Sequence, residues 1–379
     1  MREIVAGLAA AVLLLAGCGP PPSTGSPTGS PTGSPTGSPT GTATGSRSPD
    51  GTATATTVTP SPSESPPAAV QPLEAAYEKV ITDVLPSIVQ ITTKVGLGSG
   101  IVYDSAGHIV TNAHVVGQAT EMEVTFATGG APRKAKLVKS FSAGDLAVIK
   151  VDDPEGLRPA TFGDSSNLRV GQIVLAMGNP LGLSGSVTNG IISALGRTVT
   201  EPQNPGSPGA TIAGAIQTSA AINPGNSGGA LVDLSGNVIG IPTLAATDPD
   251  LGGGTAPGIG FAIPSNTARD IAAQIVKDGR VTNSHRAALG IRGSTIIGAD
   301  GQPTGVAVAR VEPDGGAAKA GIRAGDVIVS INGEQTPTMA SLSETLTALK
   351  PGQRARVGVI RANGTKETII VTMSQLPGE

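Results

Sequence analysis

Three residues of this chain have the types and the chain order of a nucleophile, its base and the acid that orients the base. His114 lies in the stretch TNAHVV, Asp145 in GDLAVIKV and Ser227 in NPGNSGGAL. A serine hydroxyl is a weak nucleophile until a neighbouring base removes its proton, and an acid commonly holds that base in the correct tautomer. The order His, Asp, Ser is one of the known chain orders for such triads and predicts acyl-transfer chemistry.

Each of the three residues also has a purely structural interpretation. Gly, Asn and Ser are common turn residues, so the stretch around Ser227 can be an ordinary turn, and Asp145 can cap its own loop. His114 can be a structural histidine at the end of an apolar strand, with its hydrogen bonds made to neighbouring groups. Glycines also let backbone groups approach a ligand closely, and the occurrence of a base and an acid upstream favours the catalytic interpretation.

The remaining histidines and the pentapeptide Gly-x-Ser-x-Gly allow one alternative triad. His108 in DSAGH and His285 in VTNSHR lie in polar stretches, where we expect exposed side chains without partners. The pentapeptide around Ser227 matches the nucleophile elbow of α/β-hydrolases, which requires a helix after the serine and a histidine downstream. A strand-like pattern follows Ser227, and the downstream His285 lies at a domain junction, so this alternative is disfavoured.

Short strands must position these residues. From Val80 onward, β-branched runs alternate with Gly, Asn and Asp turns, which predicts a β-barrel or sandwich. The runs are SIVQITT, GSGIVYD, HIVTNAHVV, MEVTFA, LAVIKV, IVLAMG, VTNGIIS and NVIGI. A helix is predicted over 265–279, with Ser265 or Asn266 as its cap and Gly279 at its end.

A second pattern of strands begins after Arg286. The stretches ALGIRG, GVAVARV, DVIVSING, RARVGVI and ETIIVTM predict strands, and TMASLSETLTALK predicts a helix. The apolar residues of that helix recur at helical spacing and predict a small second core. They are Met339, Leu342, Leu346 and Leu349.

The N-terminus predicts a signal peptide that is cleaved and a mature chain that is anchored to a membrane. Residues 4–17 form an apolar run that is too short to span a bilayer comfortably and suits a signal sequence. It ends in Leu-Ala-Gly-Cys, which resembles a bacterial lipobox, so we expect residues 1–18 to be a lipoprotein-type signal peptide and Cys18 to be lipidated. An ordinary signal peptide is the alternative. Residues 19–70 repeat GSPT and predict a disordered Ser/Thr/Pro/Gly linker.

Composition excludes several other classes of function. Charged residues make up 14% of the chain, the net charge is -3 and aromatic residues make up 2%, so neither a basic footprint nor a stacking platform for nucleic acid is present. Cys18 is the single cysteine, which excludes internal disulfides. Three scattered histidines without a second cysteine do not predict a zinc site, and we expect no metal and no cofactor.

Several long motifs in order resemble the HtrA/Deg family of trypsin-like serine proteases over residues 73–376. They are TNAHVV, GDLAVIKV, AMGNPLGLSGSVTNGIISALGR, QTSAAINPGNSGGAL and GIGFAIPSN, and GAAKAGIRAGDVIVSINGE closely resembles a PDZ segment. The resemblance implies a mainly β protein: a chymotrypsin-like double β-barrel over 71–280, with the triad between its barrels, followed by an α+β PDZ domain over 286–376.

The resemblance also assigns further site residues. Backbone N–H groups of Gly225 and Ser227, on either side of Asn226, would form the oxyanion hole. Residues 220–222 would line the pocket for the side chain before the scissile bond, and because no aspartate stands there, small aliphatic side chains are expected; ordinary barrel core is the alternative. These residues are Ala220, Ala221 and Ile222. One departure is Ser219, where family members commonly have an acidic residue.

In the C-terminal domain, ALGIRG resembles the carboxylate-binding loop of PDZ domains, so N–H groups of Leu289, Gly290 and Ile291 would bind C-terminal peptides. A strand entry without a ligand is the alternative. The family resemblance implies an extracytoplasmic, lipid-anchored endopeptidase of the bacterial envelope that cleaves unfolded or damaged proteins, and a homotrimer formed near residues 73–85. The alternative is a peptide-binding holdase or sensor whose protease site mostly rests.

Overall fold

The structure is a computed structural model that describes residues 71–94, 96–179, 185–201, 209–223, 225–248 and 254–378. The predicted signal peptide, Cys18 and the whole predicted linker lie outside the described residues. No helix in the described part combines the length and the apolar character that crossing a membrane requires.

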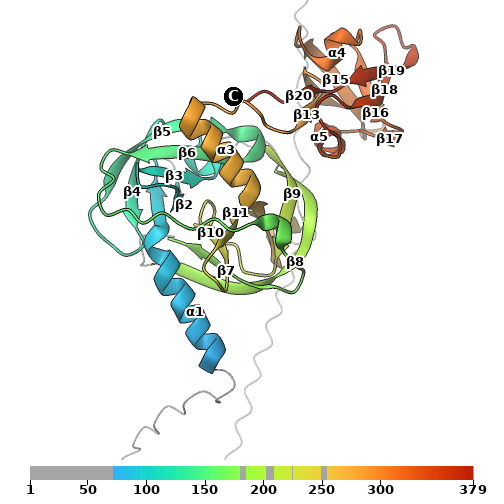
Figure 1. Cartoon of the computed structure of the whole chain (residues 1–379). Helices are drawn as coiled ribbons and strands as arrows, with labels where there is room; N and C mark the ends of the chain where they lie inside the picture. The colour runs from blue at the N-terminus through green and yellow to red at the C-terminus, as the bar shows by residue number, and fades with distance from the viewer. Residues whose placement is uncertain are drawn as a thin grey trace, which may run out of the picture. The chain divides into compact units, whose positions relative to one another are not determined.

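The first six strands close into a barrel in the order β1-β2-β3-β6-β5-β4 (Figure 1). Its interior is aliphatic, because the chain has no Trp and few Phe: Ile91, Ile109, Val124 and Ile149 have no exposed surface. The strands are β1 (Ile88–Thr92), β2 (Leu97–Val102), β3 (His108–Thr111), β4 (Glu121–Phe126), β5 (Arg133–Phe141) and β6 (Leu146–Val151).

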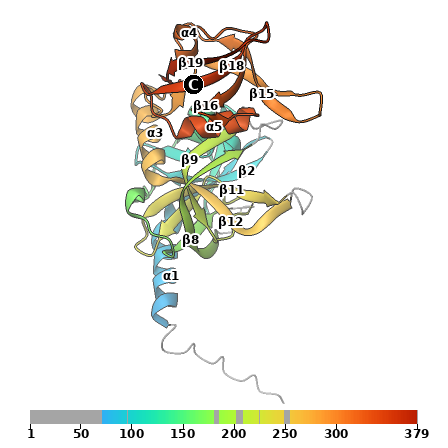
Figure 2. The ribbon, with the colours of Figure 1, turned by 90° about the vertical axis from the view of Figure 1, so that its right-hand side faces the viewer.

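The next six strands close into a second barrel in the order β10-β11-β12-β9-β8-β7. Neighbouring strands pair antiparallel throughout, and Figure 2 shows β8, β9, β12 and β11 side by side. The strands are β7 (Ile173–Gly178), β8 (Ser186–Glu201), β9 (Ala210–Thr218), β10 (Ala230–Asp233), β11 (Val238–Asp248) and β12 (Gly254–Pro264).

The helices around the barrels are few and mostly short. Helix α3 (Ser265–Asp278) contacts β6 of the first barrel and β11 of the second (Figure 1). Gly279 ends it in the left-handed conformation, as predicted, but the predicted caps are wrong: Pro264 is the N-cap, and Ser265 and Asn266 bind the segment before β7 instead. The others are α1 (Gln71–Val84), η1 (Leu85–Ser87), α2 (Ala113–Val116), η2 (Ser142–Gly144) and η3 (Ser165–Asn167).

The C-terminal domain is a sheet in the order β14-β15-β16-β18-β19 with its own apolar core, and β17 pairs with β16. Helix α5 (Met339–Thr347) begins with a capping box between Thr338 and Ser341, which explains why the helix starts there. The remaining elements are β13 (Ala287–Ala288), β14 (Ile291–Ile297), β15 (Pro303–Val311), α4 (Gly316–Lys319), β16 (Val327–Ile331), β17 (Glu334–Gln335), β18 (Arg354–Ile360), β19 (Lys366–Thr372) and β20 (Ser374–Gln375).

The predicted fold class is confirmed: two closed barrels are followed by an α+β domain. The sequence patterns identified most strands, and the strand-like pattern after Ser227 is β10, but α1, β9 and β12 were not recognised. Strand β5 begins with the alternation that is typical of a half-exposed strand: Lys134 and Lys136 are exposed, and Ala135 between them is buried.

Candidate active site

His114 lies on α2, a single helical turn that follows β3, and not at a strand end as expected. Asn112 is the residue before this turn, and Gly117 ends the turn with φ 56°. The small neighbouring side chains leave the imidazole partly accessible, with 24% of its surface exposed. The short turn therefore holds the ring against the barrel and leaves about a quarter of it accessible.

Asp145 is held in an unusual backbone conformation directly before β6. Its φ of 52° and ψ of 41° are left-handed, which is uncommon for residues other than glycine and clusters at functional sites. The residue is 1% exposed. Its carboxylate accepts hydrogen bonds from the backbone N–H of His114 at 3.0 Å and from the imidazole Nδ1 at 2.9 Å. The acid therefore fixes both the position and the tautomer of the base.

Two further residues hold Asp145, and the sequence analysis did not identify either. The Thr243 hydroxyl donates to Oδ2 of Asp145, and the Asn112 side-chain amide donates to the Asp145 carbonyl at 3.0 Å. Both residues are buried. Thr243 belongs to the second barrel, so the acid of the first barrel is fixed by a strand of the second. The sequence offered one signal, a polar Thr inside the apolar stretch VIGIPTLAA.

The surroundings of His114 raise the pKa of its imidazole. Burial acts in the opposite direction and lowers the pKa, but the hydrogen bond and the charge of Asp145 raise it, and so does the charge of Glu201. The net effect favours the imidazolium. A base with a raised pKa becomes available only at a higher pH than an ordinary histidine would.

Ser227 lies in the turn before β10, at the contact between the barrels. Its hydroxyl donates to the Thr243 carbonyl at 3.0 Å. Its own carbonyl accepts a hydrogen bond from the N–H of Ser99 at 2.9 Å, and the Ser99 hydroxyl donates to the Gly225 carbonyl. The fully buried Ser99 on β2 therefore fastens the nucleophile turn to the first barrel. The sequence analysis read GSGIVYD only as a strand and missed this role.

The turn around Ser227 depends on its glycines. Gly225 and Gly228 have φ of 105° and 82°. A Cβ on Gly228 would overlap the Ser99 carbonyl and the Thr111 hydroxyl, so this position requires close backbone approach. The N–H of Asn226 donates to the Asn223 carbonyl at 3.0 Å. Asn226 is therefore engaged within the turn.

The three expected pocket residues have different environments. Ala220 and Ile222 are buried and pack with the interior side chains of the second barrel. Ala221 is exposed, and its carbonyl accepts hydrogen bonds from the Thr188 hydroxyl at 2.8 Å and the Asn226 amide at 3.3 Å. The Ser219 hydroxyl accepts a hydrogen bond from the N–H of Ile191 at 3.0 Å, so the serine serves the local backbone.

The other two histidines are not part of this cluster. His108 is less exposed than predicted: 12% of its side chain is accessible, because Nδ1 pairs with Asp104 at 2.7 Å. His285 is exposed as predicted, but it has a partner, Asp270, at 3.3 Å.

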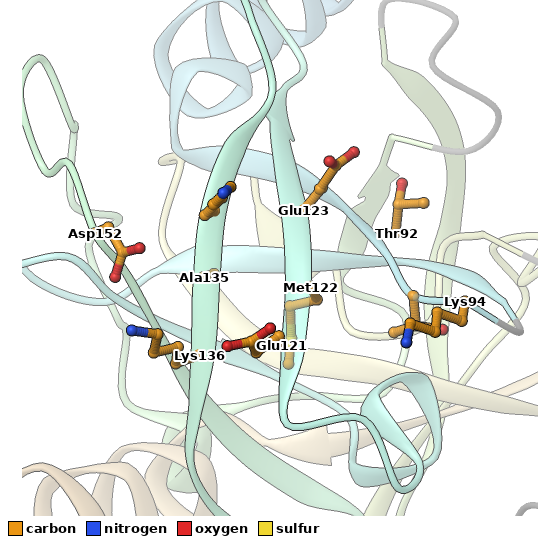
Figure 3. A pocket seen from close by; sticks show the side chains of 10 residues that line it. Thr92, Lys94, Glu121, Met122, Glu123, Ala135, Lys136 and Asp152 are labelled. Carbon is orange, nitrogen blue, oxygen red and sulfur yellow. The ribbon is translucent and has the colours of Figure 1, made fainter.

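The outer face of the first barrel has a hollow of about 520 Å³ that contains none of the triad residues (Figure 3). Residues of opposite charge are neighbours in the register of β4 and β5: Glu121 lies opposite Lys136, and Glu123 lies opposite Lys134. Lys94 and Asp152 complete the charged lining. The lining has three cationic and three anionic side chains, so the hollow has no net charge that would select an ionic ligand.

The expected carboxylate-binding loop of the C-terminal domain borders a groove of about 490 Å³. Gly290 has φ of 75°, and Leu289 is buried. In the described residues β14 ends the sheet path, so its outer edge suits an added peptide strand. The apolar residues that line the groove include Leu289, Ile291, Met339, Leu342 and Leu346.

Comparisons with known proteins agree with this architecture. Residues 98–241 match the family model of the trypsin-like peptidase domain, and residues 270–373 match that of the PDZ domain. The periplasmic pH-dependent serine endoprotease DegQ of Escherichia coli (strain K12) is 40% identical over 286 residues, which are 73% of this chain and 59% of that protein. This chain thus spans little more than half the length of that relative.

Other relatives match over more of their length. The chloroplastic protease Do-like 1 of Arabidopsis thaliana is 38% identical over 343 residues, 83% of this chain and 75% of that protein. The structure of the HtrA-type protease AlgW with a decapeptide is 31% identical, covers 79% of this chain and 99% of that chain, and superposes with a TM-score of 0.53. With two barrels that carry His114, Asp145 and Ser227 and a PDZ domain after them, this chain belongs to the HtrA family of trypsin-like serine proteases.

Proposed function

We propose that this protein is a serine endopeptidase of the bacterial cell envelope that cleaves unfolded or damaged polypeptides. The observation that carries the proposal is the hydrogen bond between His114 and the buried Asp145, together with Thr243, whose hydroxyl donates to Asp145 and whose carbonyl accepts from Ser227. Such a fixed arrangement of base and acid beside a serine is what acyl transfer requires.

The residues then act in sequence. His114 takes the proton of Ser227 as the hydroxyl attacks a peptide carbonyl, and it later donates that proton to the leaving amine. Asp145 stabilises the imidazolium between these steps. Backbone N–H groups of Gly225 and Ser227 bind the oxyanion, and each such donor contributes about 3 kcal/mol to the transition state. Before attack, the Ser227 hydroxyl must leave the Thr243 carbonyl.

In this proposal, the substrate side chain that precedes the scissile bond lies against the segment 220–222, which contains Ala221. Ala220 and Ile222 support that segment from the core of the barrel. No acidic side chain stands in these three positions, so small aliphatic side chains are favoured over Lys or Arg.

The PDZ domain binds C-terminal peptides in the groove along β14, with Leu289, Gly290 and Ile291 at the carboxylate. Acylation of Cys18 anchors the chain, and residues 19–70 serve as a tether. A single acyl chain binds membranes weakly, so more than one chain is required for a stable anchor. We further propose a homotrimer formed through the segment at residues 73–85.

A second candidate function is a peptide-binding sensor whose protease site rests. It is favoured by the bond from the Ser227 hydroxyl to the Thr243 carbonyl. In this state the hydroxyl is directed to a backbone acceptor. A C-terminal peptide that binds the PDZ domain would then either free the Ser227 hydroxyl for proteolysis or leave it bonded to Thr243, in which case the protein acts only as a sensor.

Labelling with a fluorophosphonate probe tests both candidates. We expect the full chain to be labelled and to cleave casein, and Ser227→Ala to lose both activities while it unfolds at the same temperature. Labelling that rises when C-terminal peptides are added identifies a regulated endopeptidase. Absence of labelling with every peptide supports the sensor, and equal casein cleavage by Ser227→Ala contradicts the proposed triad.

A further inference from the structure

A third ionisable side chain faces the base and the acid. Glu201 is the last residue of β8, and ligand-type atoms of Glu201, His114 and Asp145 all lie within 4.8 Å of one another. Its Oε2 atom is buried. The sequence analysis did not single this residue out, because it lies among polar residues beyond the motif SALGR.

The fold explains how Glu201 reaches this position. Glu201 pairs with Ala210 at the end of the β8–β9 hairpin. Strand β9 contacts η2, the short turn that leads into Asp145. The second barrel therefore brings the Glu201 carboxylate close to His114, the base that the first barrel carries. The Thr243 hydroxyl reaches Asp145 at this same contact between the barrels.

Two carboxylates thus face one imidazole. Helix α2 packs against β2, β5, β6 and η2, and the basic side chains of β5 and β6 are not among the charges that act on His114. In the described part of the chain, those charges are Asp145 and Glu201, and both favour a positive imidazole. A partly buried carboxylate at this separation interacts more strongly with the ring than an exposed one would.

We propose that Glu201 is a positioning residue that holds His114 as the imidazolium in the resting site and thereby delays proteolysis to higher pH. This inference rests on the proposed endopeptidase function. An imidazolium has no lone pair with which to accept the Ser227 proton, so the hydroxyl must donate elsewhere. The Thr243 carbonyl accepts it.

The direction of the pH effect follows from the charge. Removing a neighbouring negative charge destabilises the imidazolium, so the pKa of His114 falls and the neutral base becomes available at lower pH. Glu201→Gln keeps the size and polarity of the side chain and removes its charge. We expect the acid limb of kcat/KM to move down by about one pH unit.

The test measures kcat/KM of the full chain against pH with a fluorescent casein substrate. At pH values on the acid side of this limb, kcat/KM of Glu201→Gln should be up to about tenfold higher than kcat/KM of the natural protein. Glu121→Gln is the matched control, since Glu121 lies on the outer face of the first barrel, and its limb should not move. Equal limbs in Glu201→Gln and the natural protein overturn the inference. A lower rate at every pH with an unmoved limb assigns Glu201 a structural role only.

A second measurement does not depend on proteolysis. In the Ser227→Ala background, an NMR titration of the imidazole nitrogens follows His114 directly, and variants of His108 and His285 assign its signals. We expect a lower midpoint for His114 once Glu201→Gln is added. If casein is never cleaved but this midpoint moves, the proposed function fails and the role of Glu201 stands. If the His114 midpoint does not move, the role of Glu201 is refuted, and the proposed endopeptidase function is not.

Discussion

At the scale of single residues, the site is organised around Asp145. Its carboxylate receives the His114 backbone N–H, the imidazole and the Thr243 hydroxyl, while its backbone adopts a left-handed conformation. A buried carboxylate needs such donors, because an unsatisfied buried charge is strongly destabilising. The same bonds orient the base, so stability and catalysis depend on the same contacts.

Removing one of these donors should weaken catalysis without removing the triad. Thr243→Val deletes the hydroxyl and keeps the carbonyl, so Asp145 loses one bond worth about 1–2 kcal/mol. We expect kcat/KM to fall roughly tenfold. Thr243→Ser restores a hydroxyl and should recover most of the activity. If Thr243→Val is as active as the natural protein, the hydroxyl does not position the acid.

At the scale of elements, the turn before β10 is the critical piece. Ser99 on β2 and Thr111 on β3 leave no space beside Gly228, so the nucleophile turn packs directly against the first barrel. By contrast, Gly236 lies in the turn between β10 and β11 with a similar φ of 79°, and its nearest neighbour for an added Cβ is Val84 at an ordinary 3.5 Å.

Alanine at these two glycines separates backbone strain from steric overlap. Gly236→Ala should lower the free energy of unfolding by about 1 kcal/mol, since only the positive φ is disfavoured. Gly228→Ala carries the same strain and must also displace the Ser99 carbonyl, so we expect loss of probe labelling at Ser227. Both variants are compared by thermal unfolding and fluorophosphonate labelling. Full labelling of Gly228→Ala would show that the turn tolerates displacement.

At the scale of the whole molecule, the protein combines a trypsin-like domain of two barrels, a PDZ domain and an N-terminal segment outside the described residues. The barrels need no disulfide, because aliphatic side chains fill both interiors.

Membrane anchoring by Cys18 can be tested on the full chain in a bacterial host. We expect the natural protein to remain with membranes in high salt, to be released by detergent and to incorporate labelled palmitate. Cys18→Ala should lose the label. Because Cys18 is the only cysteine, no other thiol can carry the lipid. Equal palmitate incorporation in both proteins would contradict lipidation at this residue.

The sequence by itself determined most of the strands and selected three candidate groups, His114, Asp145 and Ser227. Alternating apolar residues and turn residues define strands, and a serine that needs a base and an acid restricted the choice among three histidines. Only the tertiary structure decided which groups surround the triad. Ser99, Glu201 and Thr243 reach the site from separate strands, and no local pattern encodes such contacts, since they depend on how the two barrels meet. The left-handed backbone of Asp145 likewise depends on its tertiary partners.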